Sequence, residues 1–144
     1  MIPVFVPDAS VALPWCFKDE TTAYTDSLLD RLIAGEVVTV PPHWPVEVSN
    51  GLVQAKKRGR VDEERIGRFL DDLSSFHILV DNVYDFAILK RVRGFAEQQR
   101  LTTYDAAYLE LAQRTGLPLA TLDSDLQRAA RALGVPLLEP EIAQ

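Results

Sequence analysis

The stretch Val4-Phe5-Val6-Pro7-Asp8-Ala9-Ser10 decides the fold that the sequence predicts. Its three β-prone residues end at Pro7-Asp8, and a helix is expected from Ser10, with a possible kink at Pro14. The same order of strand, aspartate and helix recurs in Leu119-Ala120-Thr121-Leu122-Asp123, which Ser124 follows as the start of a helix. Two strands are therefore predicted to end in a carboxylate.

Strands and helices alternate between these two stretches. Further strands are expected over 37–40, 77–80 and 117–122, with a last short run over 135–138, and further helices over about 22–34, 45–57, 62–75, 84–99, 104–115 and 124–133. Such alternation predicts an α/β fold, with a parallel sheet covered by helices on both faces. At 144 residues, with no linker or internal repeat, the chain is expected to form a single domain over 1–144.

The composition is that of a soluble globular protein, with 47% apolar and 25% charged residues. No apolar run approaches the roughly 20 residues of a membrane span. Asp8 and Pro14 interrupt the N-terminal stretch that a signal peptide would keep apolar, so a cytoplasmic protein is expected. Cys16 is the only cysteine, which excludes an intrachain disulfide and a cysteine metal cluster and favours a buried thiol.

Acidic residues stand where the predicted strands end. Ligands of open parallel α/β sheets bind beyond the carboxyl ends of the strands, so Asp8 and Asp123 are expected to lie at one edge of the sheet. Glu47 follows the strand over 37–40, in the first turn of its helix, and points toward the same edge. Asp105 also lies in a first helical turn, but its sequence position does not show where that helix docks.

Each acid also has a structural explanation. Asp8 and Asp123 could be helix N-caps, Glu47 could offset a helix dipole, and Thr102 with Asp105 resembles a capping box. Together, however, carboxylates in one crevice repel by roughly 4 kcal/mol per pair at about 4 Å and an effective dielectric of about 20, so such a cluster normally needs a cation. Oxygen donors without cysteine or suitably spaced histidine favour one or two Mg²⁺ or Mn²⁺ ions.

Neighbouring polar residues are candidates for supporting roles. Ser10, Asn50 and Thr121 can hydrogen-bond carboxylates or metal-bound water, although packing or capping explains each equally well. Asp125 is interpreted as a solvated first-turn residue more than as a fifth ligand. His43 and His77 are interpreted as structural residues that do not lie near these motifs. Trp15 and Trp44 could stack on bases, but packing in the core is the favoured interpretation.

The net charge of −6 by itself counts against a nucleic-acid partner, but the charges are unevenly distributed along the chain. Nine of the 15 basic residues lie between Lys56 and Arg93 against seven acidic residues, so this segment carries about +2 and the remainder about −8. Contacts to RNA are therefore expected from this segment, first from Lys56, Lys57, Arg58 and Arg60. A solvated helix face is the alternative interpretation.

Four ordered blocks make nearly the whole chain resemble the PIN domain family, and within it the VapC-type toxins of prokaryotic toxin–antitoxin pairs. They are Val6-Pro7-Asp8-Ala9-Ser10, Pro45-Val46-Glu47-Val48-Ser49-Asn50, Leu101-Thr102-Thr103-Tyr104-Asp105-Ala106-Ala107-Tyr108 and Leu119-Ala120-Thr121-Leu122-Asp123. The resemblance implies a three-layer α/β/α sandwich and a Mg²⁺- or Mn²⁺-dependent endoribonuclease. It places the family's metal-binding and catalytic acids at Asp8, Glu47, Asp105 and Asp123. It also implies a homodimer and a cognate antitoxin that occupies the site.

Other enzyme classes fit the sequence less well. A haloacid dehalogenase-type phosphotransferase expects a second acid where this chain has Ser10. A response-regulator receiver expects an adjacent acidic pair and a lysine late in the chain, but no lysine follows Lys90. A non-catalytic RNA- or partner-binding module and a DNA substrate stay open.

Overall fold

The computed structural model describes residues 1–139. Its elements in chain order are β1 (Pro3–Pro7), α1 (Ala9–Ala12), the 3₁₀ helix η1 (Leu13–Trp15), α2 (Ala23–Ile33), β2 (Val37–Val40), α3 (Trp44–Lys57), α4 (Glu63–Ser75), β3 (His77–Val80), α5 (Phe86–Gln99), α6 (Thr103–Thr115), β4 (Leu119–Ala120) and α7 (Ser124–Ala132). This order confirms the predicted alternation.

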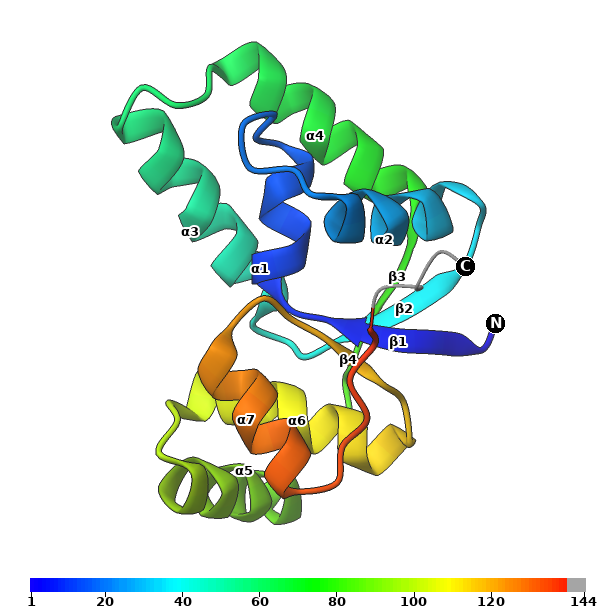
Figure 1. The fold of residues 1–144 in the computed structure, drawn as a ribbon, viewed down its shortest axis with the longest axis vertical. Helices are drawn as coiled ribbons and strands as arrows, with labels where there is room; N and C mark the ends of the chain where they lie inside the picture. Colours follow the sequence, from blue (N-terminus) through cyan, green and yellow to red (C-terminus); the bar gives the residue numbers. More distant parts are fainter. Residues whose placement is uncertain (140–144) are drawn as a thin grey trace.

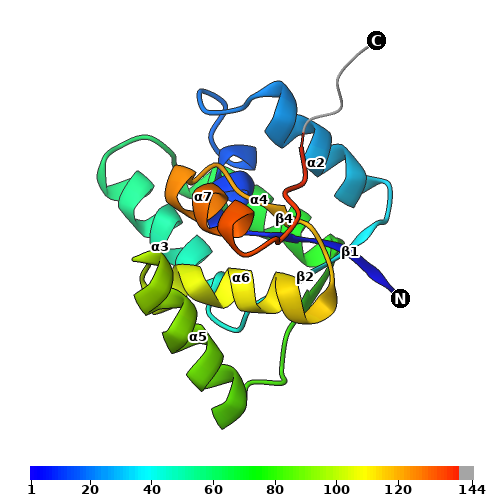
Figure 2. The same cartoon turned by 60° about the horizontal axis from the view of Figure 1, so that its bottom comes forward.

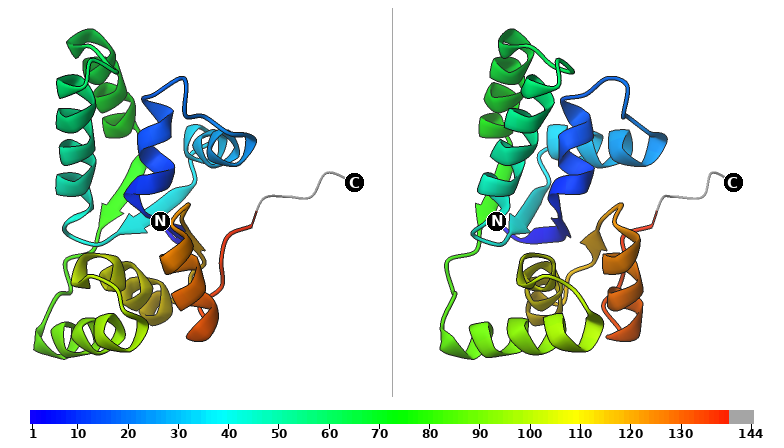
Figure 3. Two further views of the ribbon diagram at one scale, coloured as in Figure 1. Left: turned by 60° about the vertical axis from the view of Figure 1, so that its left-hand side comes forward. Right: turned by 90° about the vertical axis from the view of Figure 1, so that its left-hand side faces the viewer.

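The four strands form one parallel sheet in the order β3-β2-β1-β4. Helices α1 to α4 cover one face and α5 to α7 the other, which gives the expected three-layer α/β/α sandwich (Figure 1). The left view of Figure 3 shows α3 and α4 as a helical hairpin on one side of the sheet, and Figure 2 shows α5 beside α6 in the opposite layer.

The strand predicted over 117–122 is shorter in the structure. Only Leu119–Ala120 is a strand, and it pairs with Val6 and Pro7 of β1. Pro118 has no backbone N–H to donate, and the N–H of Leu117 is already bound to the carbonyl of Ala112 at the end of α6, 3.1 Å away. The run over 135–138 adds one parallel bridge, between Leu137 and Leu119.

Two predicted helix boundaries also differ. The first helix does not kink at Pro14 but ends at Ala12 and continues as the 3₁₀ turn η1. Helix α5 begins at Phe86 and not at Tyr84, because Asp85 is its N-cap and accepts a hydrogen bond from the N–H of Ile88 at 3.0 Å.

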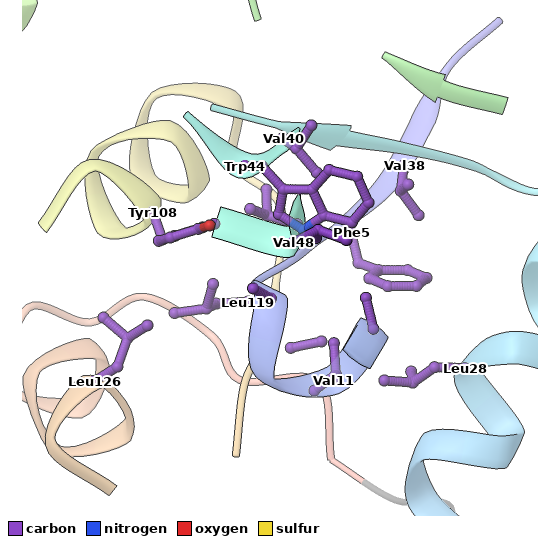
Figure 4. Packing of buried hydrophobic residues seen from close by; sticks show 14 of the residues in the cluster. Phe5, Val11, Leu28, Val38, Val40, Trp44, Val48, Tyr108, Leu119 and Leu126 are labelled. Atoms are coloured by element: carbon purple, nitrogen blue, oxygen red, sulfur yellow. The ribbon is translucent and has the colours of Figure 1, made fainter. Parts of the chain in front are cut away.

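The main hydrophobic core lies between the sheet and helices of both layers. Figure 4 shows Phe5 and Val38 from the sheet packing near Trp44 and Leu28. Trp15 and Trp44 are buried, as predicted, and so is Cys16. None of the helices within residues 1–139 combines the length and apolar composition that a membrane span requires.

Candidate active site

Asp8 lies at the point where the order of the strands in the sheet reverses. From β1 the chain proceeds outward through β2 and β3, and β4 returns to the other side of β1. The crevice between the carboxyl ends of β1 and β4 is therefore a topological switch point, where ligands of open α/β sheets bind. Asp8 follows β1 directly, and its N–H donates to the carbonyl of Ala120 in β4 at 3.0 Å.

Hydrogen bonds fix the carboxylate of Asp8 from both sides. Oδ1 accepts from the backbone N–H of Ser10 at 3.0 Å and from the Ser10 hydroxyl, and Oδ2 accepts from the Thr121 hydroxyl. Burial nevertheless raises the pKa of Asp8 to about 6, and these donors only partly oppose it. Asp8 is thus a rigidly held carboxylate whose negative charge lacks a compensating cation among the described residues.

The same hydrogen bonds connect Asp8 to Asp123. Ser10 Oγ accepts from the N–H of Leu122 at 2.8 Å, and Thr121 Oγ1 accepts from the N–H of Asp123 at 3.0 Å. The predicted supporting residues Ser10 and Thr121 therefore contact Asp8 and link the two strand ends. Asn50, the third such residue, is exposed and makes no side-chain hydrogen bond within residues 1–139.

Glu47 lies in the first turn of α3 and is held on one oxygen. Its Oε1 accepts from the Tyr108 hydroxyl at 2.8 Å and lies 2.9 Å from Nε2 of His43. Although burial acts in the opposite direction, these two contacts lower the pKa of Glu47. Oε2 has no hydrogen-bond partner among the described residues, so it can bind a cation or a water molecule.

The interpretation of His43 as a residue outside the site was wrong. Its Nε2 lies 2.9 Å from both Glu47 Oε1 and the carbonyl oxygen of Tyr104. Both neighbours accept hydrogen bonds, so Nε2 carries the hydrogen. The sequence held one signal for this contact, because His43 and Glu47 stand four residues apart and α3 begins between them. His77 is exposed on β3.

Asp105 approaches the other acids from α6. Thr102 is the N-cap of this helix, and its hydroxyl accepts from the N–H of Asp105 at 3.1 Å. Burial, then the charges of Asp123 and Glu47, raise the pKa of Asp105. Asp105 on α6 therefore lies within electrostatic range of Glu47 on α3 and of Asp123 after β4, which the sequence alone could not show for Asp105.

The structural explanations for these acids hold alongside a functional one. Asp8 is the N-cap of α1 and Asp123 the N-cap of α7. Asp123 caps with Oδ1 alone, which accepts from the N–H groups of Asp125 and Leu126. Its Oδ2 makes no hydrogen bond within residues 1–139. Asp125 is exposed and lies 4.0 Å from Arg128, consistent with a solvated residue.

The four basic residues expected to contact RNA differ in their surroundings. Lys56 pairs with Glu63 at 2.7 Å, and Arg60 pairs with Glu20 at 2.7 Å. Lys57 and Arg58 are exposed and have no ion pair within the described part of the chain. Arg58 lines a cavity of about 390 Å³ whose wall also includes Ser10 and is thus one hydrogen bond from Asp8.

The carboxylates at the ends of β1 and β4 offer the oxygen donors that Mg²⁺ and Mn²⁺ prefer. Within residues 1–139, no group of three His, Cys, Asp or Glu side chains forms a ready-made metal site. Mg²⁺, however, is usually bound by one or two carboxylates and keeps several waters. Buried Asp8, together with the free carboxylate oxygens of Glu47 and Asp123 and the raised pKa of Asp105, fits that mode of binding.

The comparisons agree with this fold: the chain belongs to the PIN domain family, whose model matches residues 5–132. Among curated proteins it is similar to Ribonuclease VapC3 of Pyrobaculum aerophilum, with 35% identity over 91 residues, 62% of this chain and 69% of the relative. It is also similar to Exonuclease VapC9 of the same organism, with 38% identity over 81 residues, 56% of this chain and 57% of the relative, which is less than two thirds of that protein.

A solved structure supports the fold. The crystal structure of PAE2754 from Pyrobaculum aerophilum superposes with a TM-score of 0.66 and 29% sequence identity. The match covers 88% of this chain and 79% of the other. The three-layer architecture predicted from the sequence is thus shared with a solved protein.

Proposed function

We propose that this protein is a Mg²⁺- or Mn²⁺-dependent endoribonuclease that hydrolyses RNA phosphodiester bonds. The observation that carries the proposal is that Thr121 links Asp8 to Asp123 at the ends of β1 and β4, while Asp105 lies close enough to Asp123 and Glu47 for their charges to raise its pKa. The acids belong to separate segments of the chain, so a cation that offsets their repulsion explains why they converge. The word "ribonuclease" in the name of VapC3 supports RNA as the substrate.

Asp8, Asp105 and Asp123 are the proposed ligands, directly or through water, and Glu47 either binds a second ion or receives the proton of the attacking water. A bound ion lowers the pKa of water and offsets phosphate charge. Oε2 of Glu47 is suited to the proton, because His43 and Tyr108 hold Oε1 and leave Oε2 free. Ser10 and Thr121 keep Asp8 in place, since each donates a hydroxyl to it.

Arg58 is the strongest candidate for holding the RNA backbone. It has no ion pair within the described residues, and the cavity that it lines reaches Ser10. Lys56 and Arg60 are already neutralised by acidic neighbours. Arg58→Ala should therefore weaken RNA binding and reduce its salt dependence more than Lys56→Ala does.

The decisive experiment uses linear and circular forms of one unstructured RNA, incubated with purified protein in Mg²⁺ or Mn²⁺, beside EDTA and Asp8→Asn controls. An endonuclease opens the circle. An exonuclease, as the name of VapC9 describes that relative, degrades only the linear form. Cleavage that persists in EDTA or with Asp8→Asn contradicts the metal mechanism.

The remaining alternatives have their own outcomes in this assay. Binding of RNA without cleavage in either metal ion favours the non-catalytic module. Cleavage of single-stranded DNA of the same sequence at an equal rate would assign a broader nuclease.

We further propose that the protein acts in the cytoplasm as the toxin of a toxin–antitoxin pair, held inactive by a cognate antitoxin. The names of the VapC relatives support this role. Expression of the wild-type protein should arrest bacterial growth, whereas Asp8→Asn should not. Arrest by both proteins would contradict a toxicity that depends on this site.

A homodimer is also proposed, through the apolar surface formed by Val80, Val83, Phe86 and Leu89. All four side chains are exposed, Phe86 by 81%. They lie between the end of β3 and the start of α5, and exposed apolar residues close together often mark protein interfaces. Light scattering should give twice the chain mass for the wild type and the single-chain mass for Phe86→Glu. A wild-type protein with the mass of one chain contradicts the dimer.

A further inference from the structure

A second cavity lies between the start of α6 and the loop after β3. It has a volume of about 330 Å³, near the lower end of the roughly 300–1,000 Å³ typical of ligand pockets. Its lining contains three aromatic rings and no Asp, Glu, Lys or Arg: Pro42, His43, Tyr84, Thr103, Tyr104 and Ala107.

The two tyrosines of this cavity are exposed. Tyr104 is 64% and Tyr84 46% exposed, and neither hydroxyl makes a hydrogen bond within residues 1–139. Burial in the core therefore does not explain them. His43 adds a third ring, whose centroid lies 5.7 Å from that of Tyr104 at a tilt of 58°.

The cavity is directly connected to the acidic residues. Tyr104 immediately precedes Asp105, and the Tyr104 carbonyl and Glu47 Oε1 both lie 2.9 Å from Nε2 of His43. A group bound in the cavity therefore lies next to whatever the carboxylates hold. Because the lining carries no lysine or arginine, the cavity is suited to an uncharged planar group and not to a phosphate.

We propose that this cavity binds one unpaired base of the RNA, adjacent to the phosphate that is cut. This rests on the proposed function for the identity of the ligand. Unpaired bases stack on aromatic side chains in single-stranded RNA recognition, and Tyr104 and Tyr84 present such rings. Thr103 supplies a hydroxyl for the edge of the base. The site thus selects single-stranded RNA at one position.

The test measures binding in the Asp8→Asn background, so that cleavage does not interfere. Fluorescence anisotropy with a short unstructured RNA is compared with RNAs that each lack one base. One abasic position should weaken binding about 10-fold. Tyr104→Ala should weaken binding of the intact RNA by about the same factor. In this variant, removal of the same base should cause no further loss of affinity. Tyr104→Phe keeps the ring and should bind as tightly as the protein with Tyr104.

Leu70→Ala is the control and should leave RNA binding unchanged, because Leu70 is 46% exposed on α4, does not line the cavity and lies outside the proposed dimer surface. An abasic penalty that is equal with and without the Tyr104→Ala substitution overturns the proposal. So does a loss of dimer mass on Tyr104→Ala, which would assign the cavity to a protein interface.

The same experiment separates the two proposals. If the wild-type protein cuts RNA, but the losses of affinity from the missing base and from Tyr104→Ala simply add, the base site alone is overturned. If these two losses of affinity do not add, but the protein cuts no RNA in Mg²⁺ or Mn²⁺, the enzymatic function alone is overturned. Absence of any RNA binding overturns both.

Discussion

At the scale of single residues, burial and hydrogen bonding act in opposite directions on the pKa of Asp8. Its carboxylate is surrounded by donors, yet burial raises its pKa from 3.8 to about 6. In the metal-free protein, the folded state therefore holds this proton more tightly than the unfolded state does. Stability from this group is fully present below about pH 4 and is lost as the pH rises to about 6.

Asp8→Asn should therefore stabilise the metal-free protein at neutral pH by about 1–3 kcal/mol, since the amide carries no charge to bury. The difference should shrink as the pH falls from 6 to 4. Urea unfolding in EDTA across this pH range measures it. Mn²⁺ at about 100 times its Kd should add about 2.7 kcal/mol to the wild type and much less to the variant. A large loss of stability on Asp8→Asn would show that its N-cap role dominates.

His43 is expected to act by positioning Glu47. His43→Ala removes a contact of 2.9 Å to Oε1, so Glu47 should sample other rotamers, and the cleavage rate should fall by about 10- to 100-fold. Tyr108→Phe removes the other donor to the same oxygen while keeping the ring, and should lower the rate in the same direction. Rates are measured in single-turnover cleavage. His77→Ala is the control, because His77 is exposed on β3, and equal rates for His43→Ala and wild type would refute the assignment.

At the scale of elements, the start of α6 sets the place of Asp105. Thr102→Ala removes the N-cap and should cost about 1 kcal/mol of unfolding free energy. Because the lost hydrogen bond is to the N–H of Asp105 itself, the rise in melting temperature on adding Mn²⁺ should also shrink. Calorimetry with and without Mn²⁺ measures both effects.

Asp62→Ala is the control for this prediction, because Asp62 is the N-cap of α4 and follows the end of α3 opposite to Glu47. It should cost similar stability and leave the Mn²⁺ effect unchanged. An unaltered Mn²⁺ effect in Thr102→Ala would mean that Asp105 is held in place by other contacts.

At the scale of the whole molecule, a charged network joins α6 to the segment after β3 and to α5. Glu110 is only 3% exposed and contacts Arg114 at 3.0 Å and Arg91 at 3.3 Å, while Arg114 also pairs with Asp81 at 2.6 Å. Such a network holds α5 and α6 against the β3 edge of the sheet, because a buried carboxylate requires its partners.

Arg114→Leu should therefore destabilise the protein by about 3 kcal/mol, since it leaves Glu110 short of a partner. The double variant Arg114→Leu with Glu110→Leu should lose less, because the most buried charge of the network is then absent and only Asp81 lacks its partner. Urea unfolding measures both. The exposed pair of Arg93 and Glu97 is the control, and Arg93→Ala should change stability by about 0.5 kcal/mol or less. Equal losses in the single and double variants would contradict the role of this network.

The sequence by itself determined the order of strands and helices and the placement of Asp8 and Asp123, because strand-end aspartates followed by helices are local patterns. It also indicated Glu47, through its place in a first helical turn. It overestimated the strand over 117–122, since the competing hydrogen bond of Leu117 to α6 is not visible in a propensity. It also set the start of α5 two residues early, because Asp85 and not Tyr84 supplies the local boundary.

Only the tertiary structure decided which residues meet across the chain. The docking of α6 brings Asp105 near Glu47 and Asp123 and places Tyr108 on Glu47, 61 positions away in the sequence. It also brings His43 into the site. Ion pairs with acidic neighbours distinguish Lys56 and Arg60 from Arg58, which has none within the described residues. The physical reason is that helix docking, ion pairing and burial depend on packing between distant segments, whereas the local spacing of residues fixes only the elements and their ends.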